Sequence, residues 1–195
     1  MFYIFTILFC MAIIVLCNAI ALPPALGFSI IELVIWTTVC TISVIIIDGI
    51  FATIVRRLLP LKWFSTEKKG FVAGKRERRF YEKIGIKKWK EKVIELGVFT
   101  SFRKNKIAEP NNVEYIRRYI IEANFGIVCH VAGIIFGVGA VFCCPKTLWF
   151  SVGVPVVAVN VVLSALPTFI LRYNLTKLHV LYKYNIKRQS VTINH

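Results

Sequence analysis

Long apolar segments alternate with polar ones along the chain. Four of them hold almost no charge, and each has the length of about 20 helical residues that a bilayer core of ~30 Å requires. They comprise residues 2–22, 28–55, 123–144 and 147–171. None alternates apolar and polar residues as a barrel strand would. The pattern predicts an all-α polytopic membrane protein with about four spans, paired as two transmembrane helical hairpins at 1–55 and 119–171.

Composition and charge agree with that prediction. The chain has 195 residues, of which 57% are hydrophobic, yet its net charge is +15. A soluble domain of this size is rarely so apolar. The section 56–118 holds 19 of the 25 Lys and Arg residues, and the tail 172–195 holds 5. Because basic loops stay in the cytoplasm, we expect a multi-pass protein of the cell membrane, with this section, this tail and both termini cytoplasmic.

The first apolar segment has an alternative interpretation as a signal peptide. Residues 19–21 are similar to a signal-peptidase site, so cleavage of residues 1–21 is a second interpretation of the first span, although no Lys or Arg precedes its apolar core. Cleavage would leave three spans.

The basic section has no nucleic-acid-binding motif, and anionic membrane lipids account for its charge. The six cysteines lack the spacing of a zinc site, and we expect no metal.

The pattern of the basic section predicts helices that lie on the membrane surface. Apolar residues of 86–97 recur at helical spacing around Trp89, with lysines and glutamates on the remaining faces, and Gly97 is a natural stop. A shorter helix is expected upstream, ending at Gly85. The sequence EPNN at 109–112 should break the chain before the next helix. A basic helix with a Trp suits the headgroup boundary, either as an anchor or as a site for the anionic part of a substrate.

Glu122 and His130 are the most unusual residues of the third apolar segment. Ionisable groups inside a membrane are costly and usually face a bundle interior or a wet cavity. Glu122 lies one helical turn from Arg118, so an ion pair between them is plausible. His130 lies between Gly126 and Gly133, small residues that allow close approach of another helix or a substrate. His130 is either a buried structural histidine or a general base.

Four sequence motifs, in order, resemble the glycosyl-4,4'-diaponeurosporenoate acyltransferases of staphyloxanthin-type carotenoid biosynthesis. They are RRLLPLKWF at 56–64, FYEKIGIKKWKEKVIELG at 80–97, IIE at 120–122 with His130, and LPTFILRYNLTKL at 166–178. In the family a carboxylate often precedes the histidine by three positions, but here position 127 is Ile. Asp48 or Glu32 of the second span is the candidate replacement.

The resemblance implies transfer of a fatty acyl group to a sugar hydroxyl of a glycosylated lipid or carotenoid. It implies no cofactor, with an acyl thioester as co-substrate. His130 would be the general base, and Glu122 a second catalytic residue. The residues implied in binding the donor, the oxyanion or the sugar are Arg172, Tyr173, Asn174, Arg118 and Trp89.

Two other classes of protein remain as alternatives. One is a non-enzymatic membrane protein that binds lipid or assists a complex. The other is a small transporter, in which Asp48, Glu122 and His130 would form a proton path. The enzyme interpretation predicts that His130, Glu122 and Arg172 converge on one cleft open to the cytoplasmic leaflet.

Overall fold

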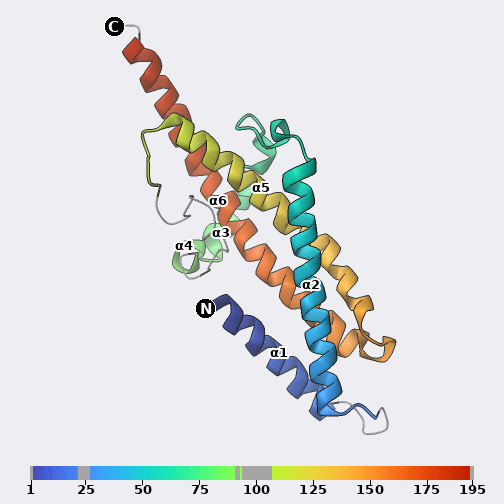
Figure 1. The fold of residues 1–195 in the computed structure, drawn as a ribbon. Coiled ribbons are helices and arrows are strands. Elements are labelled where there is room, and N and C mark those ends of the chain that lie inside the picture. Colours follow the sequence, from blue (N-terminus) through green and yellow to red (C-terminus); the bar gives the residue numbers. More distant parts are fainter. Residues whose placement is uncertain (1, 22–26, 91–92, 94–106, 194–195) are drawn as a thin grey trace. The chain divides into compact units, whose positions relative to one another are not determined.

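The computed structural model describes residues 2–21, 27–90, 93 and 107–193, and these residues form helices and connecting turns with no strand. Four helical segments are long and apolar enough to cross a membrane, which confirms the all-helical prediction. The long helices are α1 (Phe2–Ala21), α2 (Ile30–Leu58), α5 (Val113–Gly137) and α6 (Val154–Ile193), as Figure 1 shows.

The chain divides into two compact units. The first comprises residues 1–54 and 129–165, and the second comprises residues 55–128 and 166–195. The long helices α2, α5 and α6 each contribute one part to either unit. Each unit therefore has its own core, and each core is built from segments that are distant in sequence.

In the first unit, the core joins α1, α2 and α6 to the turn between the last two long helices. Its fully buried members include Cys40, Leu148 and Val152. That turn consists of the 3-10 segments η5 (Val138–Cys143) and η6 (Lys146–Leu148) and the π-helical turn η7 (Trp149–Gly153). The Nδ2 of Asn18 on α1 donates to the carbonyl of Ser151 at 2.7 Å. This bond ties α1 to the π-helical turn.

In the second unit, the first half of α5 packs along the second half of α6 (Figure 1). Ile116 and Ile120 meet Leu175 and Leu178 there, and all four are buried. The apolar segment of the sequence ends near residue 171, whereas α6 continues through Ile193. The predicted tail is thus largely a helical extension of the fourth span, held by an apolar stripe on one face.

The basic section begins with short elements. They are η2 (Leu61–Phe64), η3 (Lys69–Phe71), α3 (Lys75–Lys83) and α4 (Ile86–Trp89). Gly85 separates the last two with a φ of +69°, a left-handed conformation that favours glycine, so the expected short helix ends where predicted. Of the helix expected over 86–97, the structure describes α4 and a following turn. Most of the remainder lies outside the described residues.

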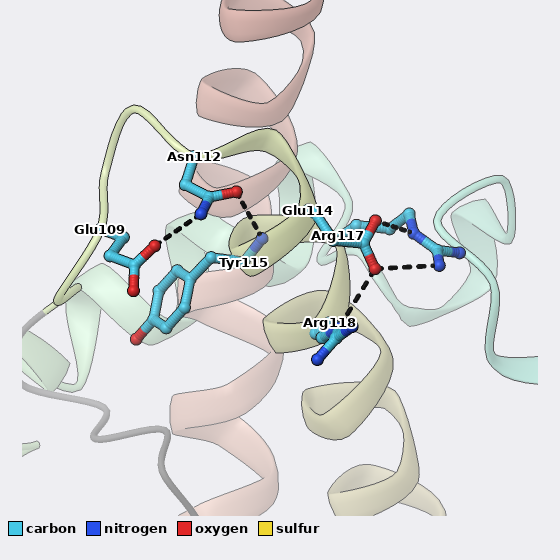
Figure 2. A network of polar contacts seen from close by, with 6 residues as sticks. All are labelled: Glu109, Asn112, Glu114, Tyr115, Arg117 and Arg118. Atoms are coloured by element: carbon cyan, nitrogen blue, oxygen red, sulfur yellow. Dashed lines mark hydrogen bonds and ion pairs between the residues drawn. The ribbon is translucent and has the colours of Figure 1, made fainter.

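The start of α5 is fixed by a side-chain cap (Figure 2). The Oδ1 of Asn112 accepts a hydrogen bond from the backbone N–H of Tyr115 at 3.1 Å, and its Nδ2 donates to Glu109 at 2.5 Å. Asparagine is among the best residues for this position, because its oxygen binds an N–H that the helix itself cannot satisfy. The break predicted at 109–112 is therefore confirmed, with α5 beginning at Val113.

Candidate active site

His130 lies in the first unit, on the part of α5 that carries two glycines. Gly133 follows it by three positions and Gly137 by seven, so the three share one face of the helix. His130 is partly buried. The side chains that pack on this face therefore form the surroundings of the candidate base.

Polar side chains occupy the space that the two glycines leave open. A Cβ on Gly133 would lie 2.7 Å from Oδ1 of Asp48, and a Cβ on Gly137 would lie 2.6 Å from Nδ2 of Asn160. The Asn160 amide hydrogen-bonds Asp48 and also donates to the carbonyl of Gly133 at 3.3 Å. Asp48 Oδ1 is buried and has no hydrogen-bond partner among the described residues. The first unit thus holds a polar cluster against the helix face that carries His130.

The two carboxylates of α2 have different surroundings. Glu32 accepts hydrogen bonds from the N–H of Ser29 at 2.8 Å and from its hydroxyl at 2.9 Å, which is the reciprocal cap of a helix start. Glu32 is therefore used at the first turn of α2. Asp48 is the carboxylate that reaches α5, one turn beyond His130.

Asp48 and Asn160 also border a small cavity of the first unit. The cavity holds about 40 Å³ and lies among α1, α2 and α6. Its walls are apolar except for Thr41, Asp48 and Asn160. It has room for about one or two water-sized groups. The polar cluster therefore separates the glycine face of α5 from an apolar cavity.

Glu122 lies in the second unit and pairs with a different arginine from the one expected. Its Oε2 accepts a hydrogen bond from Arg56 at 2.9 Å, whereas Arg118 pairs with Glu114 at 3.1 Å (Figure 2). The expected pair of Arg118 and Glu122 is therefore wrong. Arg118 lies one turn from each carboxylate, and Glu114 also binds Arg117 at 2.9 Å. The pair of Arg56 and Glu122 joins the end of α2 to α5.

The segment around Phe64 is fixed to the same part of α5. Phe64 is buried and stacks on Phe125 with ring centroids 3.7 Å apart. Its carbonyl accepts a hydrogen bond from the buried Asn124 amide at 2.9 Å. Arg56 lies over the Phe125 ring at 5.9 Å from its centroid. These contacts hold the exit of the second span, with its motif RRLLPLKWF, beside Glu122.

Arg172, the expected oxyanion or donor ligand, makes a bidentate pair with Glu77 of α3. The two N–H···O distances are 2.5 and 2.8 Å, and a third bond joins Arg172 to the carbonyl of Gly70 at 3.0 Å. Tyr81 also donates to Glu77. The Arg172 guanidinium lowers the pKa of Glu77 to about 2. Burial, together with the Glu77 carboxylate, raises the pKa of Tyr81. Arg172 thus holds α3 against α6.

Tyr173, Asn174 and Trp89 differ in how far they reach solvent. Tyr173 is buried beside Tyr81, and its hydroxyl has no partner within the described parts of the chain. Asn174 is partly buried. The Trp89 indole N–H donates to the carbonyl of Ile84 at 3.0 Å, which closes the turn between α3 and α4. Trp89 therefore packs against the core of the second unit.

Comparison with known families decides what kind of protein carries these residues. Residues 60–184 match the model of the glycosyl-4,4'-diaponeurosporenoate acyltransferase family. The chain belongs to this family. No curated protein and no solved structure matches the chain. The protein is thus an acyltransferase of carotenoid biosynthesis, as its motifs predict.

The matched region of this acyltransferase contains most of the site residues described above. It includes Phe64, Glu77, Glu122, His130 and Arg172, but it begins after Asp48 and Arg56. No group of three or more His, Cys, Asp or Glu side chains that could hold a metal ion occurs in the described parts of the acyltransferase. Convergence of His130, Glu122 and Arg172 on one cleft stays a prediction.

Sequence reasoning missed several residues of these sites. Asn160 carried a signal, since it is a polar residue within an apolar segment. Glu77 carried none, because it is one of many charged residues in the basic section. Arg56 belongs to the motif RRLLPLKWF, but its pairing could not be predicted, because the partners of Glu77 and Arg56 lie 95 and 66 positions away.

Proposed function

We propose that the protein transfers a fatty acyl group from a thioester donor to a sugar hydroxyl of a glycosylated lipid, with His130 as the general base. Membership of the acyltransferase family over residues 60–184 is the observation that carries this proposal. The helices that could cross a membrane suit it, because both the acyl chain and the lipid part of the acceptor are apolar.

The proposed reaction needs one proton acceptor. His130 takes the proton of the sugar hydroxyl, and the oxygen attacks the thioester carbonyl. The C–O bond forms, the C–S bond breaks, and the departing thiolate receives the proton from His130. The polar cluster of Asp48 and Asn160 against the same face of α5 supports a role for this face, because ionisable residues within a membrane commonly mark functional sites.

The binding roles follow from chemistry and from the contacts of each residue. Asn174 is proposed to hydrogen-bond the sugar, and Glu122, which pairs with Arg56, is proposed as a second catalytic residue. Arg172 and Tyr173 act by holding α3 and α6 together, since the first is paired and the second is buried. Arg118, which is largely exposed, and Trp89 are proposed to face the donor.

The test is lipid mass spectrometry on membranes that receive a labelled acyl donor and a panel of glycolipids, including a carotenoid glucoside. His130→Ala is compared with His179→Ala, a matched change at a histidine outside the proposed site. We expect the wild type and His179→Ala to form a labelled ester and His130→Ala to lose it by at least 100-fold, the usual contribution of general base catalysis being about 10²–10⁴-fold.

The other outcomes are informative as well. Equal ester formation by both variants would remove His130 as the base while keeping the acyltransferase. Absence of ester with every acceptor and donor, from a protein shown to be folded, would favour a lipid-binding role instead.

A further inference from the structure

The part of α6 beyond the fourth apolar segment carries an exposed row of side chains. Val180, Tyr184, Lys187 and Val191 recur at steps of four, three and four positions, so they lie on one face of the helix. The three apolar members are 67%, 62% and 53% exposed, and the lysine is exposed as well. The face that packs on α5 lies on the opposite side of the helix, where leucines are buried. A row with this spacing is the usual form in which a helix meets a partner.

With the fourth apolar segment placed in the bilayer, lipid cannot reach most of the exposed row. The apolar segment ends near residue 171, and α6 continues through residues 172–193, which extend for about 33 Å at 1.5 Å per residue. The headgroup layer outside the hydrocarbon core is only about 5–8 Å thick. Even a tilt of about 40°, the upper end of the usual range, would leave the helix end roughly 25 Å from the core. The exposed row therefore lies mainly in water.

The packing of α5 keeps this part of α6 from turning along the membrane surface. α5 is one helix from Val113 to Gly137 with no proline inside it, and its first half packs along residues 171–182 of α6. The Nδ2 of Asn185 donates to the carbonyl of Pro110 at 2.7 Å, so the contact extends to the loop before α5 (Figure 1). Long helices without such a break bend only gently. The two packed helices therefore keep a common direction.

The charge of the same segment indicates what kind of partner fits the exposed row. Residues 172–195 contain five Lys and Arg residues and no Asp or Glu. Lys187 lies within the row and Lys183 beside it, and both are exposed without an ion-pair partner among the described residues. Tyr184 is of a residue type that often anchors protein interfaces. Apolar side chains and a tyrosine bordered by unpaired ammonium groups complement a protein surface that is acidic and partly apolar.

We propose that the exposed row binds an acidic carrier protein that presents the acyl group as a thioester, an inference that rests on the proposed use of a thioester donor. Acyl carrier proteins are small, acidic and helical, so a helix of the carrier can lie against α6. Lys183 and Lys187 pair with its carboxylates, while Val180, Tyr184 and Val191 contact its apolar side chains. A coenzyme A thioester has no such surface, so the exposed row distinguishes the two forms of the donor.

The test compares two donors with the same acyl chain, the loaded acyl carrier protein and the coenzyme A thioester. The enzyme is used in nanodiscs of neutral lipid with saturating acceptor. For Lys187→Glu we expect the KM for the carrier-protein donor to rise at least about tenfold, because like charges then face each other, with kcat unchanged. Tyr184→Ala should raise the same KM, and the KM for the coenzyme A thioester should stay as in the wild type. Lys68→Glu is the matched control, since it makes the same charge change at an exposed lysine between η2 and η3.

Equal changes for both donors, or an equal change in Lys68→Glu, would overturn the proposal. Turnover of the coenzyme A thioester without turnover of the carrier protein would also overturn it, while leaving the proposed acyl transfer intact. An effect of Lys187→Glu that appears only with anionic lipid in the nanodiscs would assign the exposed row to the membrane surface instead. If neither donor is turned over, equilibrium binding of the loaded carrier protein to the wild type and to Lys187→Glu decides: weaker binding by the variant supports the exposed row, and equal or absent binding rejects it.

Discussion

Gly133 and Gly137 are the residues at which the packing of the first unit is least tolerant of change. Side chains of Asp48 and Asn160 fill the positions where a Cβ would be, at 2.7 and 2.6 Å. The glycines thus allow polar groups of two other helices to reach the backbone of α5. Small residues have this use in membrane helices, where close contact replaces the hydrophobic effect as the source of association.

Gly133→Ala should therefore destabilise the protein. The new methyl group must displace the Asp48 carboxyl from its contact with Asn160, and overpacking of this kind costs about 1–3 kcal/mol. The measurement is thermal unfolding in detergent. Gly49→Ala is the matched control, because a Cβ there meets nothing within 4 Å, and helix propensity favours alanine by up to about 1 kcal/mol. If Gly133→Ala were as stable as the control, the packing of Asp48 against α5 would be wrong.

For single residues, the sequence indicated which side chains are unusual but not which side chains they contact. His130 and Glu122 stood out because charge is rare in apolar segments, and Gly126 and Gly133 signalled close approach. The structure confirms that approach, since a Cβ on Gly126 would lie 3.0 Å from Leu171. The partner of Glu122 was not predictable, because local spacing favoured Arg118 and the actual Arg56 lies on another helix.

Among the elements, α3 depends on its contacts with α6. Its sequence is strongly charged, and it has nine residues, too few to be stable as an isolated helix. The pairing of Glu77 with Arg172, together with the packing of Tyr81 against Phe169 and Tyr173, fixes it on α6. The Glu77 side chain is 29% exposed and that of Arg172 is 23% exposed, so solvent screens the pair only in part.

The docking of α3 should weaken in acid. Because the pKa of Glu77 falls from 4.5 to about 2 in the folded protein, its contribution is complete above pH 4.5 and is lost as the pH falls through about 2. The contribution is up to about 3 kcal/mol. Hydrogen exchange of residues 75–83 in detergent would measure it. Glu77→Gln should expose these amides already at pH 7, whereas Glu82→Gln, which removes only the exposed pair with Arg78, should leave them protected. Equal protection in both variants would contradict the anchoring role.

The first turn of α5 offers a second prediction for an element. Asn112→Ala removes the oxygen that binds the Tyr115 N–H and should cost about 1 kcal/mol, mostly as faster exchange of the amides of residues 113–116. Asn111→Ala is the control, since Asn111 is exposed and lies one position before the cap. An equal effect of both substitutions would show that the loop as a whole, and not the cap, fixes this helix end.

The positions of the helices were more predictable from the sequence than the contacts of single residues. Apolar length indicated the four long helices, and EPNN indicated the start of α5. The extension of α6 to Ile193 was not predicted, because the residues after 171 have the composition of a solvated basic tail. Their apolar stripe becomes evident only where it packs against the apolar stripe of α5. An apolar stripe can be recognised only together with the surface that it packs against, and that surface comes from a segment about 60 positions earlier in the chain.

For the whole molecule, the distribution of charge predicts an orientation in the membrane. The basic section and tail hold 24 of the 25 Lys and Arg residues, and the connection after α5 holds only Lys146. The tendency of basic loops to stay in the cytoplasm predicts that the helix ends near residues 58, 113 and 193 lie on that side. The acyl donor would meet the protein there, and the turn from η5 to η7 would lie outside.

This orientation predicts opposite labelling of two positions. In a variant without native cysteines, Thr147→Cys should react with a membrane-impermeant thiol reagent in intact cells, because Thr147 is exposed in the outer turn. Ser190→Cys, exposed near the end of α6, should react only after the cells are permeabilised. Each variant is the control of the other, since both sites are accessible to water once the membrane is open. Labelling of Ser190→Cys in intact cells would show the opposite orientation, with the end of α6 outside, where cytoplasmic acyl thioesters do not occur.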